Sequence, residues 1–309
     1  MGSAIVREII RDRPMTDPSR RPILIAGPTA SGKSAIALAW AERYGGIIIN
    51  ADSMQVYREL RILTARPTAE EEARVPHALY GHVPGREAYS VGRWVEDVEA
   101  ALQDAQKRDL RPIIVGGTGL YFKALLEGLS PIPAIPQPIR AHWRAEAERL
   151  GAAALHSVLA EKDPEMAARL SATDTQRITR ALEVLDATGR SLADWQREAG
   201  RPVLDPDETD RYLVTIDREA LYARCDRRLD AMMAGGALRE VRHLLELDLD
   251  PDLPILGALG VRPLADLLAG RCSAEAAAAQ VKAETRQYAK RQLTWLRRNM
   301  NAWNAISTH

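Results

Sequence analysis

A glycine-rich loop at residues 27–34 constrains this chain more than any other feature of its sequence. The loop reads Gly-Pro-Thr-Ala-Ser-Gly-Lys-Ser, follows the apolar run Ile23–Ala26 and leads into the helix-forming stretch Ala35–Arg43. Its glycines let backbone N–H groups and a helix start point at one anion, to which Lys33 adds a cation and Ser34 a hydroxyl for Mg²⁺. The alternative is a turn that merely joins a strand to a helix. The predicted phosphate site, with Mg²⁺ as cofactor, consists of Gly27, Pro28, Thr29, Ala30, Ser31, Gly32, Lys33 and Ser34.

Short apolar runs that alternate with helical stretches predict an α/β fold with a parallel sheet. Strands separated by helices are typical of such sheets. Between the second and third runs, apolar residues recur at helical spacing after Ser90, which is a suitable helix cap. Together with the loop, this pattern predicts a P-loop NTPase-like parallel sheet flanked by helices. The strand-like runs are Ile23–Ala26, Ile47–Asn50, Pro112–Val115 and Tyr212–Asp217.

A proline-rich segment divides the chain. Four prolines fall between Pro131 and Pro138, and beyond them the composition shifts to Ala, Glu, Leu and Arg with helical periodicity. We expect a small all-helical insert domain at 137–204 within a core formed by 21–136 and 205–309, preceded by a flexible extension at 1–20. Two long helical stretches are expected late in the chain, at Arg218–Leu247 and Ala274–Asn299.

Charge and cysteine content exclude several classes of protein. The 309 residues include 42 basic and 42 acidic side chains, so any polyanion must bind through a local patch. The two cysteines, Cys225 and Cys272, lie far apart, which argues against a zinc motif and a disulfide framework. No segment has the apolar character of a signal peptide or a membrane span. We expect a monomeric cytoplasmic protein that does not bind membranes.

Two polar residues follow predicted strands at the edge where parallel sheets bind their ligands. Asp52 comes after the second strand, where a carboxylate can act as a general base, bind Mg²⁺ or cap the following helix. Thr118 comes after the third strand, and its hydroxyl can hold a phosphate, contact the reacting group or cap a helix. The residues alone leave these alternatives open.

Basic side chains gather at helical spacing in three places. A stripe on the last long helix can follow a nucleic-acid backbone or form a solvated face, and Trp295 within it can stack a base or anchor the helix. In the insert, Arg177 and Arg180 can clamp a phosphate or pair with acids such as Glu183. The stripe consists of Lys282, Arg286, Lys290, Arg291, Arg297 and Arg298, and the third place is the pair Arg224 and Arg228.

Six blocks of sequence, in their order and spacing, resemble the tRNA dimethylallyltransferases over Pro22–Arg297. The resemblance implies transfer of a dimethylallyl group from dimethylallyl diphosphate to N6 of the adenine immediately 3′ of the anticodon in tRNA. The loop would then hold the diphosphate leaving group, and the tRNA anticodon stem-loop would be the partner. The blocks are Gly27–Ser34, Ala51–Tyr57, Thr64–Pro67, Gly116–Tyr121, Gln176–Glu183 and Lys290–Arg297.

The same resemblance implies roles for individual residues. Asp52 would be the general base that accepts the N6 proton, and Thr118 would contact the diphosphate or the reacting amine. Lys33, Ser34 and Mg²⁺ would take the developing negative charge, and Arg224 matches a family arginine near the donor. The residues that it implies in tRNA binding are Asp52, Ser53, Met54, Gln55, Thr118, Arg140, Gln176, Arg177, Arg180, Arg262, Lys290, Arg291, Trp295 and Arg297.

The chain departs from the family pattern at Gly260-Val261-Arg262, where many members carry tyrosine in the middle position. It resembles the compact bacterial form, without the zinc-finger extension of some eukaryotic relatives. One alternative is a P-loop small-molecule kinase, in which Asp52 would activate an acceptor. The others are an adenylate isopentenyltransferase acting on free AMP and a non-catalytic nucleotide switch or RNA-binding module. The kinase accounts for the sheet and the loop but not for the second half of the chain.

Overall fold

The computed structural model describes residues 20–308, and these residues form two compact units. One unit contains the described residues up to Leu126 and again from Val203 to Thr308, and the other is Glu127–Pro202. The sequence predicts this insert at residues 137–204, so its boundaries differ from those of the second unit. The extension expected at 1–20 lies, apart from Arg20, outside the described residues.

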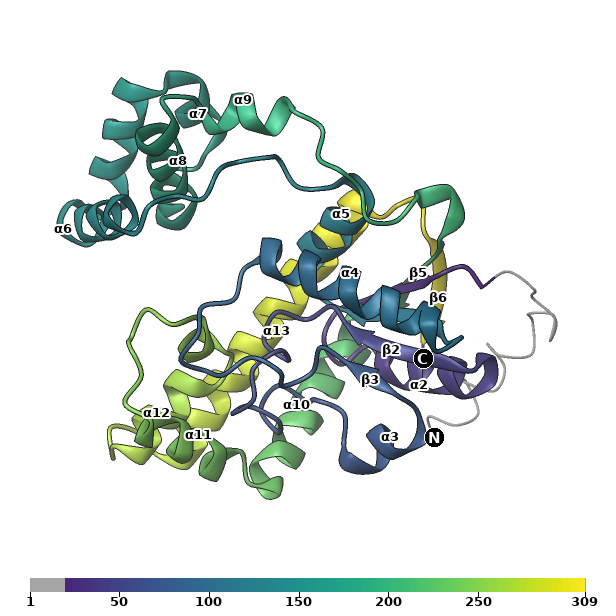
Figure 1. Ribbon diagram of the computed structural model, residues 1–309. Helices are drawn as coiled ribbons and strands as arrows, with labels where there is room; N and C mark the ends of the chain where they lie inside the picture. The colour runs from purple at the N-terminus through teal and green to yellow at the C-terminus, as the bar shows by residue number, and fades with distance from the viewer. Residues whose placement is uncertain (1–19, 309) are drawn as a thin grey trace. The chain divides into compact units, whose positions relative to one another are not determined.

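A six-stranded parallel sheet forms the centre of the first unit, in the order β3-β2-β4-β1-β5-β6. Figure 1 labels its strands β2, β3, β5 and β6. The predicted α/β architecture and its four strands are confirmed. The sequence did not predict the strands β3 and β6, because β3 has only two residues and β6 has polar side chains at three of its five positions. The strands are β1 (Ile23–Ala26), β2 (Gly46–Asn50), β3 (His77–Ala78), β4 (Arg111–Gly116), β5 (Asp210–Ile216) and β6 (Asn304–Thr308).

Alternating side chains of the central strands give the sheet an apolar core on each face. Helix α2 (Lys33–Tyr44) packs with Ile23 and Ile25 of β1. Helices α4 (Val91–Lys107), α5 (Gly119–Glu127) and α13 (Ala274–Asn299) share the other core with Leu24 and Ala26. Because neighbouring residues of a strand point to opposite faces, β1 is buried along its whole length.

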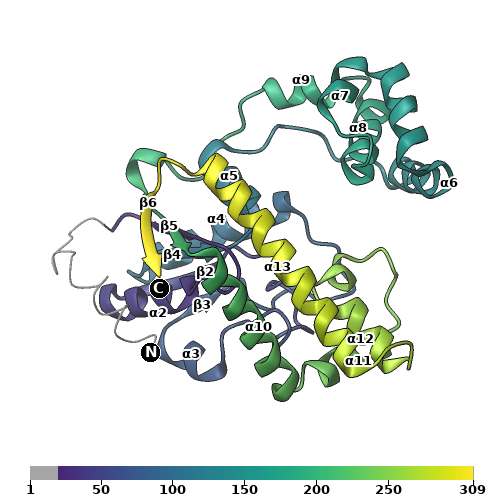
Figure 2. The same ribbon diagram turned by 180° about the vertical axis from the view of Figure 1, so that it is seen from behind.

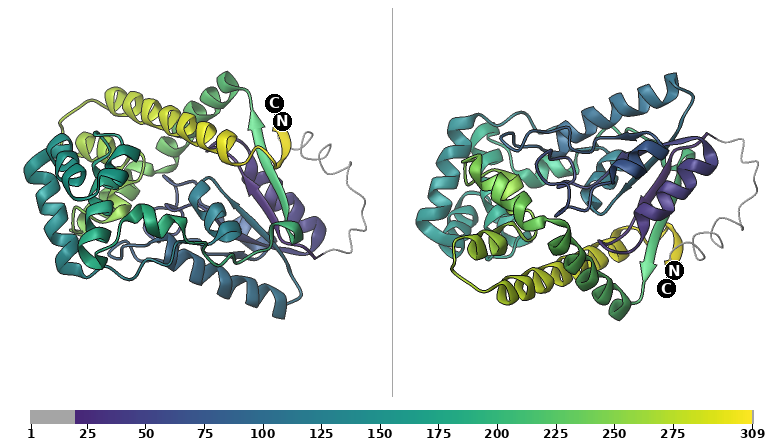
Figure 3. Two further views of the ribbon diagram at one scale, coloured as in Figure 1. Left: turned by 90° about the horizontal axis from the view of Figure 1, so that it is seen from above. Right: turned by 90° about the horizontal axis from the view of Figure 1, so that it is seen from below.

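Helices after β5 complete the first unit. The helical stretch expected at Arg218–Leu247 is confirmed, but it consists of two helices, because Gly236 has a φ of 108° and ends one helix before the next begins. Helix α13 spans the predicted range and can be followed along its length in Figures 2 and 3. The remaining elements are α3 (Ala69–Arg74), α10 (Arg218–Gly235), α11 (Ala237–Glu246), α12 (Val261–Leu268) and the 3₁₀ turns η1 (Pro206–Glu208) and η2 (Pro254–Gly257).

The second unit is helical, as the sequence predicts for its residues. No regular element interrupts the proline-rich segment 128–136. Asp174 caps α8 and Gly189, with a φ of 66°, ends it. Trp143 and Ile178 lie in a buried apolar cluster, against which the half-buried Trp195 packs. The helices are α6 (Gln137–Lys162), α7 (Pro164–Arg169), α8 (Thr175–Thr188) and α9 (Leu192–Arg197).

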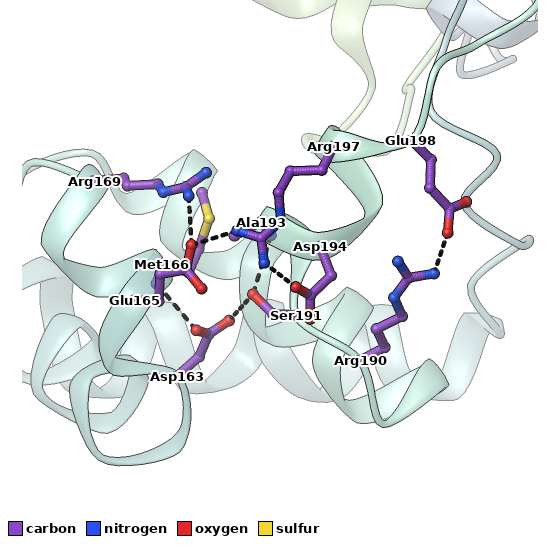
Figure 4. A network of polar contacts seen from close by, with 10 residues as sticks. All are labelled: Asp163, Glu165, Met166, Arg169, Arg190, Ser191, Ala193, Asp194, Arg197 and Glu198. Atoms are coloured by element: carbon purple, nitrogen blue, oxygen red, sulfur yellow. Dashed lines mark hydrogen bonds and ion pairs between the residues drawn. The ribbon is translucent and has the colours of Figure 1, made fainter.

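Polar contacts join α7 to α9 within this unit (Figure 4). Asp163 accepts hydrogen bonds from Met166 N at 3.0 Å and from Ser191 Oγ at 2.6 Å, so one carboxylate caps α7 and holds the start of α9. Arg197 of α9 donates to Glu165 of α7 at 2.8 Å. Each of these polar groups therefore has a hydrogen-bond or ion-pair partner within the unit.

Within residues 20–308, no helix is both long and apolar enough to cross a membrane.

Candidate active site

The loop after β1 curls back on its own backbone. Gly32 has a φ of 92°, in the left-handed region, and is the N-cap of α2. Lys33 Nζ donates a hydrogen bond to the carbonyl oxygen of Pro28 at 3.1 Å, so this side chain folds along the loop. Gly27 has no space for a side chain, since a Cβ there would lie 2.9 Å from Ser31 Oγ. The predicted loop thus presents a helix N-terminus and a cation together, which is the arrangement an anion requires.

Two arginines of α10 contact this phosphate loop, residues 27–34. Arg224 Nη1 donates to the carbonyl oxygen of Ser31 at 3.3 Å, and Arg228 Nη2 donates to the Thr29 hydroxyl. Removal from water lowers the pKa of Lys33 to about 8, although the Asp52 carboxylate opposes the shift. Removal from water also lowers the pKa of Arg228. An anion among these cations would stabilise their charged forms.

Asp52 lies directly after the carboxyl end of β2. Its Oδ1 accepts a hydrogen bond from Met54 N at 2.9 Å, which caps a turn and not a helix. The buried side chain of Asn50 holds this segment, because its Oδ1 accepts from Asp52 N at 2.9 Å and its Nδ2 donates to the carbonyl oxygen of Leu79 at 3.0 Å. The orientation of the Asp52 carboxylate is therefore fixed by its own turn.

Thr118 lies after the carboxyl end of β4, beside the loop that carries Asp52. Its Oγ1 accepts a hydrogen bond from Ser53 N at 3.1 Å. Glycine at position 116 permits this approach, since a Cβ there would lie 1.9 Å from the carbonyl oxygen of Ala51. The loops after β2 and β4 are therefore in direct contact, as the adjacency of these strands requires.

Two cavities border the phosphate loop, and Arg228 lines both. The first has a volume of about 390 Å³ and is lined by Lys33, Ser34 and Arg224 among others. The second has a volume of about 270 Å³ and contains Thr29 and Asp52 on its wall. Much of the second wall is apolar, formed by Met54, Leu63, Leu229, Met232, Leu259 and Val281.

Comparison with known proteins identifies the family of this chain. The family model described as IPP transferase matches residues 55–299, and that described as isopentenyl transferase matches residues 21–77. A tRNA dimethylallyltransferase of Nitrobacter hamburgensis is 58% identical over 278 residues, which are 90% of this chain and 88% of the relative. The chain belongs to the tRNA dimethylallyltransferase family.

Solved structures that are similar to this chain include enzymes of the same kind. The tRNA isopentenylpyrophosphate transferase of Bacillus halodurans is 33% identical with a TM-score of 0.66, over 93% of this chain and 90% of that one. A eukaryotic dimethylallyltransferase described as acting on tRNA is 27% identical with a TM-score of 0.78, over 93% of this chain and 73% of that one. The predicted resemblance is confirmed, and the chain is an enzyme of the tRNA dimethylallyltransferase class.

Helix α13 carries the basic stripe, and acidic side chains of α10 neutralise two of its charges. Lys282 Nζ lies 2.7 Å from Asp230 Oδ1, and the Arg286 guanidinium contacts both oxygens of Asp226 at 2.9 and 2.8 Å. These ion pairs join α13 to α10, so Lys282 and Arg286 contribute to the packing of the two helices. The exposed basic residues of the stripe are Lys290, Arg291, Arg297 and Arg298.

Trp295 anchors α13 to the start of α5. A Cβ on Gly119 would lie 2.1 Å from Trp295 Cζ3, so the indole occupies the space that this glycine leaves. The ring also packs against the apolar core shared by α4 and α5. Of the two alternatives that the sequence left open, the structure shows the anchor.

Other residues that the family resemblance implied in tRNA binding lie around the cavities or on α12. Gln55 lines the first cavity and its Nε2 donates to the carbonyl oxygens of Thr64 at 2.8 Å and Ala65 at 3.0 Å. Ser53 and Met54 line the second cavity. Arg262 is exposed at the start of α12. Val261, where many family members carry tyrosine, is buried in the apolar cluster of α10–α13.

Four implied tRNA-binding residues belong to the helical unit. Arg180 Nη1 lies 3.3 Å from Glu183 Oε2, which is the acidic partner that the sequence suggested. Arg177 is exposed and its Nε lies 3.4 Å from Asp174 Oδ2. Gln176 is exposed beside it on α8, whereas Arg140 is half-buried in the first turn of α6.

Sequence reasoning missed two residues of the site and assigned no role to a third. The sequence indicated Arg228 only as the i, i+4 partner of Arg224, and the structure places it on both cavities. Tyr288 of α13 lines the second cavity, where burial raises the pKa of its hydroxyl. Gln292 lies within the block Lys290–Arg297 of the family resemblance, but its contact with Thr29, 263 positions earlier in the chain, has no local signal.

Proposed function

We propose that the chain transfers a dimethylallyl group from dimethylallyl diphosphate to N6 of the adenine immediately 3′ of the anticodon in tRNA, releasing diphosphate. The main support is the position of Asp52 on a largely apolar cavity that reaches Thr29 of the phosphate loop and Arg228 of α10. A donor with a charged diphosphate at one end and a small branched hydrocarbon at the other matches these two kinds of surface.

The basic groups at the loop would stabilise the leaving group. Cleavage of the allylic carbon–oxygen bond leaves its electron pair on the diphosphate and carbocation character on the prenyl group. Lys33, Arg224 and Arg228 all contact the loop, so their charges would lie close to the developing anion. The apolar wall of the second cavity would exclude water from the prenyl group.

Asp52 would act on the acceptor. The lone pair of an adenine N6 is delocalised into its ring, so the amine needs a base to take its proton as the new carbon–nitrogen bond forms. Asp52 is held by Met54 N through Oδ1 and lines the cavity. The adenine must leave its stack in the anticodon loop to reach this carboxylate. Thr118, through Ser53, would keep the acceptor loop in place.

The residues at the loop fit Mg²⁺. Residues 20–308 contain no group of three or more His, Cys, Asp or Glu side chains that could hold a metal. Mg²⁺ commonly takes only one or two protein ligands and completes its shell with water and phosphate oxygens. Ser34, in the first turn of α2 on the first cavity, would offer its hydroxyl. When bound, Mg²⁺ would neutralise charge on the diphosphate.

A transfer assay tests this proposal. Purified protein, Mg²⁺ and labelled dimethylallyl diphosphate are incubated in parallel with unmodified tRNA, with free AMP and with ATP. We expect label in tRNA only, at the adenine 3′ of the anticodon. Label in AMP alone would instead identify an adenylate isopentenyltransferase, and ATP-dependent phosphorylation of a metabolite a kinase.

A variant of Asp52 tests the proposed base. Asp52→Asn keeps the acceptor for Met54 N but cannot take a proton, so we expect kcat to fall by a factor of about 10² to 10⁴. Binding of inorganic diphosphate, measured by calorimetry, should remain close to that of the unchanged protein. Activity equal to the unchanged protein would remove Asp52 from the mechanism.

A further inference from the structure

Gln292, on α13, joins the two loops that lie on either side of the proposed reaction. Its Oε1 accepts a hydrogen bond from the backbone N–H of Thr29 at 2.8 Å, and its Nε2 donates to the carbonyl oxygen of Gly117 at 2.9 Å. Thr29 belongs to the phosphate loop, and Gly117 directly precedes Thr118. One side chain therefore bridges the carboxyl ends of the neighbouring strands β1 and β4.

The bridge is buried and closely packed. Gln292 is 7% exposed, and a Cβ on Gly117 would lie 2.2 Å from its Nε2. One helical turn later, Trp295 fills the space beside Gly119. One face of α13 thus lies against the segment 117–119, and Gln292 provides the hydrogen bonds of that face.

The residue type at 292 matches its two partners. The N–H of Thr29 can only donate and the carbonyl oxygen of Gly117 can only accept, whereas a primary amide offers one group of each kind at a fixed separation. An ionised carboxylate would offer two acceptors, and one of them would face the Gly117 carbonyl oxygen. A hydrocarbon side chain would leave both buried backbone groups without a partner.

We propose that Gln292 is a positioning residue for prenyl transfer, which fixes the distance between the diphosphate on the phosphate loop and the acceptor amine beside Asp52. This inference rests on the proposed function. The bond between Thr118 and Ser53 continues the connection from Gly117 to the loop of Asp52. A displacement of about 1 Å between reacting groups can lower a rate by a factor of about 100, so a fixed spacing between these loops affects kcat directly.

The variant Gln292→Glu gives a test that depends on pH. When protonated, the new carboxyl group can accept from Thr29 N and donate to Gly117 O, as the amide does. When ionised, it repels that carbonyl oxygen, and its burial raises its pKa above the ordinary value of about 4.3. We therefore expect the kcat of Gln292→Glu, divided by that of the unchanged protein at the same pH, to rise severalfold as the pH falls towards 5.5.

Two further variants serve as comparisons. Gln292→Met removes both hydrogen bonds, so its kcat should be lower by a factor of about 10 to 100 at every pH. Gln287→Glu changes an exposed residue of the same helix, and its kcat ratio should not vary with pH. Circular dichroism at each pH measures the folded fraction. A kcat in Gln292→Met equal to the unchanged protein, or a loss that only follows the folded fraction, would overturn the inference.

Binding of inorganic diphosphate separates this inference from the proposed function. Release of Thr29 N should weaken diphosphate binding to Gln292→Met by a factor of about 5 to 10, the effect of one lost hydrogen bond. This measurement needs no prenyl transfer. If the unchanged protein transfers no prenyl group, the proposed function fails, while reduced diphosphate affinity still supports Gln292 as the residue that positions the phosphate loop. An unchanged affinity would overturn that role.

Discussion

The hydroxyl of Thr118 accepts a hydrogen bond from the backbone N–H of Ser53 at 3.1 Å, and this contact joins the segment after β4 to the segment after β2. Ser53 directly follows Asp52, so the position of the carboxylate depends on a residue of the segment after β4. The hydroxyl of Thr118 also lies 3.5 Å from Ser53 Oγ. The geometry around Asp52 is thus set by β2 and β4 together.

We expect Thr118→Val to lower kcat more than it lowers stability. Valine has nearly the same shape but cannot accept from Ser53 N, so the Asp52 loop loses a constraint at a cost of about 1 kcal/mol in unfolding free energy. The loss of alignment should lower kcat by a factor of about 10 or more. Thr118→Ser keeps the acceptor and is the matched control. Equal kcat values for the valine and serine variants would contradict this role.

The pKa of Lys33 predicts how pH affects the donor site. Removal from water lowers it from 10.5 to about 8, so in the ligand-free chain the lysine loses its proton as the pH rises through 8. Diphosphate binds the charged form. We expect the affinity for inorganic diphosphate, measured by calorimetry, to fall as Lys33 loses its proton above pH 8.

The lowered pKa of Lys33 also makes the stability of the fold depend on pH. Stability increases as the pH rises, whereas diphosphate affinity decreases. Because the folded-state pKa lies below the unfolded one, the charged lysine destabilises the ligand-free fold at pH 7, and this cost disappears as the pH rises from about 8 to 10.5. Lys33→Met should therefore raise the melting temperature of the ligand-free protein at pH 7, with a gain that shrinks across this interval. It should also abolish diphosphate binding. A gain that is constant with pH would contradict the assigned cause.

Arg228 offers a test with a control at the adjacent position. It lines both cavities and contacts Thr29, so Arg228→Met should remove charge stabilisation of the leaving group and lower kcat by a factor of about 10² to 10³. Arg227 is exposed on the same helix. Arg227→Met should leave kcat unchanged, as measured by initial rates at saturating substrates. A similar loss in both variants would indicate a general effect of charge and not a specific contact.

Glu240 of α11 holds the loop that forms part of the second cavity. Its carboxylate accepts hydrogen bonds from the backbone N–H groups of Arg61 at 2.6 Å and of Ile62 and Leu63 at 2.8 Å. Glu240→Gln turns an NH₂ group toward these donors and should lower the free energy of unfolding by about 1 to 3 kcal/mol, measured by urea denaturation. Glu246→Gln, exposed on the same helix, should change it by less than about 0.5 kcal/mol. Equal effects would contradict the importance of these three bonds.

Local sequence predicted the elements that carry the site, but not the contacts between them. The phosphate loop and Asp52 could be placed because each directly follows a run of buried apolar residues that marks a strand. The helix break at Gly236 was missed because the helical periodicity on both sides was followed across it, although the consecutive glycines Gly235 and Gly236 were the available signal for a helix end. Gln292 was missed for a different reason, since its role arises from a fold that brings it to Thr29 across 263 positions.

The exposed part of the α13 stripe gives a prediction for tRNA binding. Lys290 and Arg291 are exposed, whereas the ammonium of Lys282 is paired with Asp230. Each cation that contacts a phosphate contributes about 0.7 to 0.9 to the slope of log affinity against log salt concentration. Replacing both Lys290 and Arg291 by Gln should therefore weaken tRNA binding and reduce this slope by about 1.5. Lys282→Gln should leave the slope unchanged, because its charge is already neutralised. Filter binding at a series of salt concentrations measures all three proteins, and an unaltered slope in the double variant would show that the stripe is a solvated face.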